Sequence, residues 1–266
     1  MIFLKTEDEI ELLRQSNLLV AKTLAEVAKL VKPGVTTGEL DRVAEEFIRD
    51  HGAIPTFKGF PNQFGDPFPA SLCTSVNDQV VHGIPSDKIV LKEGDIVSVD
   101  CGTYMNGFCG DSAYTFCIGE VSEEVRRLLK TTKESLYLGI ENAIQGKRLG
   151  DISHAIQQHC ESNGYGVVRE FVGHGIGKEM HEDPQVPNYG RRGYGTLLKK
   201  GLCIAIEPMI TMGTRQISME NDDWTVRTRD RKYAAHFEHT VAVQPGKADI
   251  LSSFKFIEEV LGDKAI

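Results

Sequence analysis

The sequence predicts an α/β (α+β) fold in which two pseudo-symmetric halves share one curved, mostly antiparallel sheet that helices cover on one face. Three observations predict it. A Lys-x-Gly turn followed by a short apolar strand that ends on a carboxylate occurs twice, from Lys92 to Asp100 and from Lys199 to Glu207. Two helix-like segments precede each copy. A second carboxylate then opens another strand, Asp111 in one half and Glu238 in the other. A repeated order of elements with drifting spacings indicates an old duplication.

The helices are predicted from capping signals and from apolar residues at helical spacing. Thr6-Glu7-Asp8-Glu9 is a capping box, so a long amphipathic helix is expected directly after Thr6. Gly52 and Gly164 each follow a short helical segment at a position suited to a C-cap. Four helices are therefore expected, two in each half, over residues 7–31, 38–48, 122–145 and 150–160.

Strand alternation separates a bulky face of the expected sheet from a face of mostly small residues. Side chains two residues apart share a face. The residues on the side of the carboxylates are Ile96, Ser98, Ala113, Thr115, Cys117, Cys203, Ala205, Thr240 and Ala242. The residues on the opposite side are Val97, Val99, Tyr114, Phe116, Ile204, Ile206, Val241 and Val243. We therefore expect a bulky core on one face and four acids surrounded by small residues on the other.

Length and composition indicate one catalytic domain over residues 1–266, with halves of about 1–120 and 121–266, because no linker or low-complexity tract divides the chain. The net charge is −8 and the basic residues do not cluster, which disfavours dedicated binding of nucleic acid or anionic membranes. No apolar run approaches a membrane span, and a signal-peptide core is absent, so a cytoplasmic protein is expected. The six cysteines form no Cys-x-x-Cys and are expected to be reduced.

Four carboxylates on one small-residue face indicate a metal site. Like charges that share a low-dielectric site cannot all ionise, and divalent cations remove that conflict. The acids are Asp100, Asp111, Glu207 and Glu238. Together with one imidazole they form an oxygen-rich set suited to Mn²⁺, Fe²⁺, Co²⁺ or Zn²⁺, and they suffice for two ions if some carboxylates bridge. A centre with two such ions would hold a bridging water as a nucleophile and would polarise a carbonyl group for hydrolysis.

His174 is the candidate imidazole ligand, because it lies in Gly173-His174-Gly175-Ile176-Gly177, where glycines let the backbone crowd a site. His82 and His181 occupy matching His-x-x-Pro loops before the two carboxylate strands, so they are expected to contact the substrate or to support the ligands. The remaining histidines show no such placement and are interpreted as surface or structural residues: His51, His154, His159, His236 and His239.

The full set of motifs resembles methionine aminopeptidase type I, a family of pita-bread metallopeptidases (M24), over nearly the whole chain. The motifs that show the resemblance are the five candidate ligands, Val-His-Gly-Ile-Pro at 81–85, Gly-His-Gly-Ile-Gly at 173–177, His-Glu-Asp-Pro-Gln-Val from 181, Ile-Glu-Pro-Met at 206–209 and Phe-Glu-His-Thr at 237–240. The resemblance implies a pita-bread fold, two divalent metal ions, and removal of the initiator methionine from nascent polypeptides with small second residues. A bacterial or organellar source is expected, since the Cys-rich extension of eukaryotic cytosolic enzymes is absent.

The resemblance also implies roles for the site residues. Asp100 would chelate one metal, Asp111 and Glu238 would bridge both, and His174 with Glu207 would hold the other, so the two metals should differ in affinity. A metal-bridging water would attack the methionyl carbonyl while Glu207 carries the proton. His181 would stabilise the oxyanion, and His82 would contact the scissile amide nitrogen. The residues that would enclose the methionine side chain are Phe57, Phe60, Cys73 and Trp224.

Two departures from the family pattern concern substrate access. The connection from Pro61 to Ala70 is longer than is usual, and it adds Phe64 and Phe68. Met180 stands where an aromatic residue is common, directly before His181. Neither departure affects the expected metal site.

Two other functional classes fit parts of the sequence. A hydrolase of this fold that cleaves dipeptides, or an N-terminal residue before proline, would share all five ligands. A non-enzymatic binding module would be expected to have lost ligands and gained basic tails, and this chain has neither trait. The expected partners are N-termini of nascent polypeptides, with a possible transient ribosome contact, and a monomer is expected.

Overall fold

The computed structural model describes residues 1–62 and 65–266. The helices in this part of the chain are α1 (Glu7–Leu30), α2 (Thr37–Asp50), α3 (Glu123–Ile140), α4 (Leu149–Ser162), α5 (Lys255–Leu261) and the 3₁₀ helix η1 (Gly262–Lys264). The strands of the first half are β1 (Ile54–Pro55), β2 (Leu72–Val76), β3 (Gln79–Val81), β4 (Ile96–Met105) and β5 (Phe108–Cys117). The strands of the second half are β6 (Gly166–Val167), β7 (Gly173–Gly175), β8 (Glu182–Val186), β9 (Cys203–Ile206), β10 (Met209–Thr211), β11 (Ile217–Met219), β12 (Val226–Thr228), β13 (Ala234–His236), β14 (His239–Ala242) and β15 (Asp249–Ile250).

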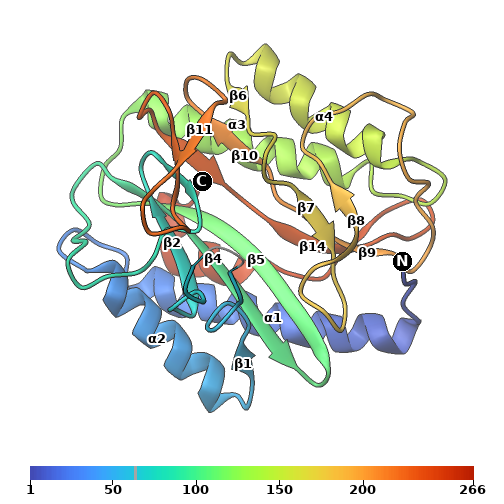
Figure 1. The fold of residues 1–266 in the computed structure, drawn as a ribbon, viewed down its shortest axis with the longest axis horizontal. Helices are drawn as coiled ribbons and strands as arrows, with labels where there is room; N and C mark the ends of the chain where they lie inside the picture. Colours follow the sequence, from blue (N-terminus) through green and yellow to red (C-terminus); the bar gives the residue numbers. More distant parts are fainter. Residues whose placement is uncertain (63–64) are drawn as a thin grey trace.

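The strands pair antiparallel in two larger and two smaller sheets. One larger sheet contains β1, β4 and β2, with β5 on the other edge of β4, and the other has the order β15-β14-β9-β7-β8. Backbone and side-chain hydrogen bonds join the two sheets at the molecular centre. The Glu238 amide donates to the Ala113 carbonyl at 2.9 Å, and the Thr240 hydroxyl donates to the Asp111 carbonyl at 2.9 Å. The two halves therefore meet along β5 and β14 (Figure 1).

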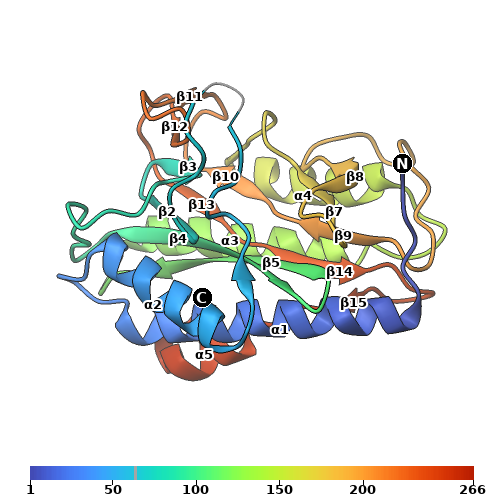
Figure 2. The same ribbon diagram turned by 60° about the horizontal axis from the view of Figure 1, so that its bottom comes forward.

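The helices pack against the bulky face of this surface, as expected. Figure 2 shows α1 running beneath β4 and β5. One continuous core draws its residues from both halves, with Leu24 of α1 and Leu128 of α3 packed with Val99, Tyr114 and the other bulky strand residues. On the opposite face, the Ser98 and Thr115 hydroxyls hydrogen-bond across β4 and β5 at 2.8 Å. Residues of both halves therefore contribute to the same core.

The repeated turns have the same backbone conformation in both halves. Gly94 and Gly201, the glycines of the two Lys-x-Gly turns, have φ of 87° and 84°. Such positive angles favour glycine, because it has no Cβ. The Gly94 amide donates to the Ile118 carbonyl, and the Gly201 amide donates to the Val243 carbonyl. The two carboxylate strands therefore start from equivalent positions, which agrees with the duplication seen in the sequence.

Three boundary predictions were wrong. The strand expected to open at Asp111 begins three residues earlier, at Phe108. The helix expected to reach residue 145 ends at Ile140, because Ile144 bridges to Gln244 and the Gln145 amide donates to the Gln244 carbonyl at 3.1 Å. The strand expected to end at Asp100 continues to Met105, since Asn106 and Gly107 form a tight turn with φ of 54° and 84°. Asn-Gly is the pair that favours such two-residue hairpins. The other three predicted helices and the two C-cap glycines agree with the structure to within two residues, whereas α5 and η1 were not predicted.

All six cysteines are free thiols, as expected, and five of them are buried. Among the described residues, no helix is both long and apolar enough to span a bilayer.

Candidate metal centre

The four carboxylates converge from the central strands of both halves. In the β4–β5 hairpin, Asp100 pairs with Ala113 and Gly102 pairs with Asp111, so the two aspartates lie on one face at diagonal positions. The β9–β14 ladder ends where Ile206 pairs with His239. Glu207 and Glu238 are the next residues of these two segments. All four acids line one cavity of about 680 Å³.

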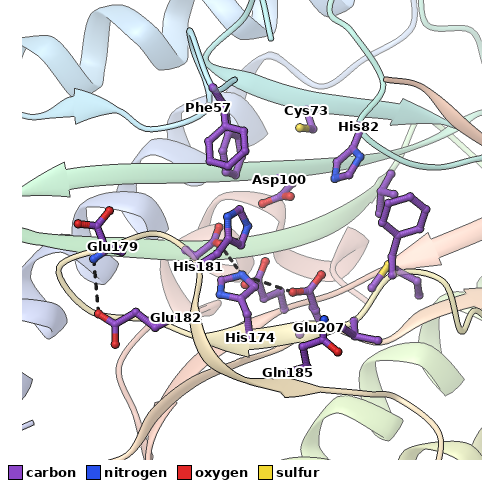
Figure 3. A pocket seen from close by; sticks show the side chains of 18 of the residues that line it. Phe57, Cys73, His82, Asp100, His174, Glu179, His181, Glu182, Gln185 and Glu207 are labelled. Atoms are coloured by element: carbon purple, nitrogen blue, oxygen red, sulfur yellow. Dashed lines mark hydrogen bonds and ion pairs between the residues drawn. The ribbon is translucent and has the colours of Figure 1, made fainter. Parts of the chain in front are cut away.

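His174 lies beside these carboxylates on the short strand β7. Its Nε2 is 3.6 Å from Asp111 Oδ2 and 3.6 Å from Glu207 Oε1 (Figure 3). Its Nδ1 lies 2.9 Å from the Gly175 carbonyl oxygen, which can only accept, so Nδ1 is the donor and Nε2 is left with its lone pair. A neutral imidazole with one nitrogen held in this way presents the other nitrogen to a metal ion.

The glycines on both sides of His174 are required by the close approach of neighbouring strands. A Cβ on Gly173 would lie 2.3 Å from the Ala205 carbonyl oxygen, and one on Gly175 would lie 2.3 Å from the Asp183 carbonyl oxygen. Since both contacts are with backbone atoms, they could not be relieved by a side-chain movement. The glycines therefore allow β8 and β9 to enclose the imidazole, which agrees with the interpretation of this motif.

Burial strongly disfavours ionisation of these acids without a counter-charge. Burial, and then the nearby Asp111, raises the pKa of Asp100 well above its usual range. Burial followed by the other carboxylates does the same to the pKa of Glu207 and of Glu238, and burial raises the pKa of Asp111. Burial lowers the pKa of His174, so its imidazole is held in the neutral form. The four carboxyl groups and the imidazole therefore form a cluster that a bound cation would stabilise.

The residues fit a divalent metal. Three carboxylate oxygens, Asp100 Oδ1, Asp111 Oδ1 and Glu238 Oε1, are buried and have no hydrogen-bond partner among the described residues. Burial of such an oxygen is unfavourable unless a group other than the protein, such as an ion, interacts with it. Ligand atoms of Asp111, His174 and Glu238 all lie within 4.8 Å of one another. A hard oxygen set with one imidazole nitrogen matches Mn²⁺, Fe²⁺, Co²⁺ or Zn²⁺.

His82 and His181 lie on opposite sides of the carboxylates, at positions that frame the cavity (Figure 3). His181 is exposed, and its ring centroid is 4.4 Å from that of His174. His82 has a positive φ of 59° and packs edge-on against Phe171 at 5.2 Å. Burial, and then the charge of His181, lowers the pKa of His82 to about 4. Both imidazoles border the space above the acids.

An apolar slot adjoins the acids. Cys73 pairs with Asp100 in the β2–β4 ladder, and its thiol lies beside that carboxylate above the sheet (Figure 3). Phe57, Phe60 and Trp224 pack around Cys73 and line the same cavity. The four residues expected to enclose an apolar side chain are therefore together at one end of the cavity. Such a mostly apolar pocket with a few polar groups is typical of a ligand site.

Residues 66–68 of the connection after Phe60 lie against this slot. The Phe60 carbonyl accepts from the Phe68 amide at 2.9 Å, and the Trp224 indole donates to the Asp66 carbonyl at 3.0 Å. The Phe68 ring meets Trp224 edge-on at 5.1 Å and lines the cavity, although it was not among the predicted site residues. Phe64 lies outside the described residues. Met180 is buried in a core cluster against Phe57 and does not line the cavity.

His236 is a cavity residue that the sequence interpretation missed. It is 2% exposed, and its Nε2 lies 3.8 Å from Glu207 Oε2 without a hydrogen-bond partner among the described residues. Burial, and then His82, lowers its pKa to about 3. His239 is structural, as expected, because it stacks on Phe254 at 3.9 Å and bonds the Ser252 hydroxyl. In the sequence, the only signal for His236 is its place two residues before a candidate ligand.

Comparisons with known proteins agree with this site. The model of metallopeptidase family M24 matches residues 11–245. A methionine aminopeptidase of Clostridium acetobutylicum is 56% identical over 252 residues, which are 95% of this chain and 99% of that protein. Methionine aminopeptidase 1 of Bacillus subtilis is 48% identical, with the same coverage of both chains.

A solved structure gives the same result at the level of the fold. The crystal structure of methionine aminopeptidase from Rickettsia prowazekii superposes with a TM-score of 0.91 at 40% identity, covering 95% of this chain and all of that one. This likeness confirms the expected pita-bread fold. Metallopeptidases act through bound metal, which agrees with the unsatisfied carboxylates described above. By its sequence match and its fold, the chain belongs to metallopeptidase family M24.

Proposed function

We propose that this protein is a metal-dependent aminopeptidase that removes the initiator methionine from nascent proteins and favours small second residues. The observation that carries this proposal is the direct contact between a buried carboxylate cluster and an apolar slot, since Asp100 and Cys73 are paired residues of neighbouring strands. The acids provide the site of peptide cleavage, and the slot selects the side chain beside it. The relatives that match almost the whole chain are named methionine aminopeptidases, which supports the proposal.

We propose that the centre holds two divalent ions. Asp100 would hold one, His174 with Glu207 would hold the other, and Asp111 with Glu238 would bridge them. When bound, such ions lower the pKa of water and polarise a carbonyl group, which is the chemistry of hydrolysis. The side with the imidazole has a softer ligand set than the Asp100 side, so the two positions should differ in affinity. Which of Co, Mn, Fe or Zn is bound depends on availability as much as on these ligands.

Proton transfer, stabilisation of the oxyanion and binding of the methionine side chain would be carried out by side chains of the protein. Glu207 has a raised pKa, and its Oε2 faces His236 across 3.8 Å, so this carboxyl group is suited to take up a proton and release it to the leaving amine. His181 would donate a hydrogen bond to the oxygen that becomes negatively charged during attack. His82, on the other side of the cavity, would contact the scissile amide nitrogen. The slot of Phe57, Phe60, Cys73 and Trp224 holds the methionine thioether, which suits such soft and apolar surroundings.

A substrate comparison tests the proposed function against its nearest rival. The metal-reconstituted protein is expected to hydrolyse Met-Ala-Ser with a kcat/KM at least about 100-fold above that for a Xaa-Pro dipeptide, because a side chain matched to an enclosed pocket contributes a few kcal/mol. Initial rates on both peptides are measured with each of the four metals. A preference for the proline substrate would assign the protein to the prolidase type of activity instead.

We further propose that the protein works in the cytoplasm as a monomer of one domain, on the N-termini of polypeptides emerging from the ribosome, with transient ribosome contact. The absence of a membrane-spanning helix among the described residues is compatible with this location. Sedimentation of the purified protein and co-sedimentation with ribosomes would measure the two partner predictions.

His236 is expected to orient Glu207. The His236 backbone is fixed by the Thr115 side chain, since the Thr115 hydroxyl donates to the His236 carbonyl at 2.7 Å. Its Nε2 faces a carboxylate oxygen, which only accepts, so the favourable tautomer has the proton on Nε2. We expect His236→Leu to lower metal affinity and kcat/KM by roughly 10- to 100-fold, as for other residues that orient metal ligands.

His236→Gln is the matched control, because its side-chain amide also offers a donor at the position of Nε2. It should retain most of the metal affinity measured by calorimetry and most of the turnover of Met-Ala-Ser. Equal losses in His236→Gln and His236→Leu would show that packing, and not the donor, is what matters at this position.

A further inference from the structure

The first four residues form an apolar segment that reaches the cavity from outside the repeated halves. Met1, Ile2, Phe3 and Leu4 are all exposed. Figure 2 shows this segment leaving α1 on the helix-covered side, passing β9 and rising to the level of β8. Met1 and Phe3 line the same cavity as the metal-site carboxylates. None of the steps proposed above uses this segment.

Lys5 anchors the segment beside the start of strand β8, directly after His181. The Lys5 ammonium forms an ion pair with Glu182, and the two side chains are only 5% and 8% exposed. The Lys5 amide donates to the Gly201 carbonyl at 2.7 Å, and Lys5 Nζ also donates to the Phe3 carbonyl at 3.3 Å. A buried ion pair with additional hydrogen bonds holds its surroundings in one geometry. Because Glu182 directly follows His181, the position of Phe3 is tied to that of His181.

The mouth of the cavity combines this apolar segment with negative charge. Glu179 and Asp183 are exposed and line the cavity, and the amino group of Met1 pairs with Asp183. Phe3 and Leu4 are similarly exposed, at 56% and 47%, but only Phe3 lines the cavity. An exposed aromatic ring at the entrance of a site can contact a bound ligand over a large apolar area.

We propose that Phe3 is a specificity-determining residue that contacts the substrate beyond its first two residues. This inference rests on the proposed aminopeptidase function. A substrate whose first side chain lies between Phe57 and Trp224 would run past His181 towards Phe3, because Lys5 links Phe3 to Glu182, the residue after His181. The ring therefore favours peptides with an apolar third residue. Glu179 disfavours peptides with an acidic third residue, because like charges repel, whereas the charge of Asp183 is already paired with the Met1 amino group.

The test compares substrates of different length in Phe3→Ala. We expect kcat/KM for Met-Ala-Leu-Ser to fall roughly five-fold, mainly through KM, because part of an apolar contact is lost. The rate on methionine 7-amido-4-methylcoumarin, which has no third residue, should stay within about 1.5-fold of the wild type, since this substrate does not reach the mouth. Phe3→Leu should restore most of the peptide rate, and Leu4→Ala is the control for an exposed apolar residue outside the cavity.

The outcomes separate this inference from the proposed function. Failure of the wild-type protein to cleave either substrate would contradict the aminopeptidase function. Equal losses on both substrates in Phe3→Ala would show that Phe3 acts through the structure of the metal site, which overturns the proposal. Unchanged rates on Met-Ala-Leu-Ser would overturn it as well. A preference for Met-Ala-Leu-Ser over Met-Ala-Asp-Ser that persists undiminished in Phe3→Ala would assign the selection to Glu179 alone and would overturn the role of Phe3.

Discussion

Glu207→Gln is expected to lower kcat on Met-Ala-Ser by at least about 1,000-fold at saturating metal, which is within the range for loss of a general acid or base that also holds a metal. The amide has the size of the carboxyl group but cannot take up a proton at neutral pH. The substitution also removes the negative charge of Glu207, whose Oε1 lies 3.6 Å from His174 Nε2. Activity is measured over a metal titration, and calorimetry gives the number of ions bound.

Glu179→Gln is the matched control for this experiment. Glu179 lines the mouth of the same cavity and is exposed, and no metal role is proposed for it. It should turn over Met-Ala-Ser with nearly the wild-type kcat. A Glu207→Gln protein that keeps more than a tenth of the wild-type kcat with two ions bound would exclude Glu207 as the proton carrier.

Glu238→Gln is expected to have opposite effects on metal-free and metal-bound protein. Glu238 is 1% exposed, and its Oε1 has no partner within the described structure. Without metal, the neutral amide removes a buried charge and can donate to a neighbouring carboxylate. We expect the free energy of unfolding of the metal-free protein to rise by about 1–3 kcal/mol at pH 8. With metal, the variant should be less stable than the wild type, because ligand binding stabilises only the folded state.

The dependence on pH has a definite sign. Burial, and then the facing carboxylates, raises the folded-state pKa of Glu238 above its ordinary value of 4.5. Between that ordinary value and the raised pKa, the folded protein binds more protons than the unfolded chain. The free energy of unfolding of the metal-free wild type must therefore fall as the pH rises through this range. Removing one such acid should make the slope shallower.

Urea denaturation in the presence of a chelator at pH 5, 6, 7 and 8 measures this slope. Glu46→Gln, on the exposed side of α2, is the control for a carboxylate that lies in solvent, and it should leave the slope unchanged. If the free energy of unfolding falls in parallel for Glu238→Gln and the wild type from pH 5 to pH 8, ionisation of the buried Glu238 carboxyl group does not destabilise the metal-free protein.

Much of the fold could be predicted because the same order of elements occurs twice. Capping residues and C-cap glycines placed the helices, and alternation on the central strands separated the core face from the acid face. The boundaries at Asp100 and residue 145 were wrong for different reasons. The Asn106-Gly107 turn is a local signal that was overlooked. The early end of α3 depends on pairing with Gln244, which is distant in the sequence.

The site was predictable to the extent that its residues belong to repeated motifs. The four acids, His174 and the pair His82 and His181 all line one cavity in the structure, although their roles remain proposals. His236, Phe68 and Phe3 were missed as cavity residues because no local pattern marks them. Each reaches the cavity through contacts across the fold: His236 through Thr115, Phe68 through Trp224, and Phe3 through Lys5.

The two halves meet along a seam between β5 and β14, and this arrangement affects when during folding the proposed active site forms. Asp111 is held on one side of this seam and Glu238 on the other, and the Ser112 hydroxyl donates to the Glu238 carbonyl across it at 2.7 Å. In the proposed ligand set, neither half of the chain holds all five ligands by itself. We therefore expect a newly synthesised molecule to be inactive until its last strands have docked against its first ones. The duplication would thus couple peptidase activity to completion of folding, because a partly folded intermediate would lack a complete metal site.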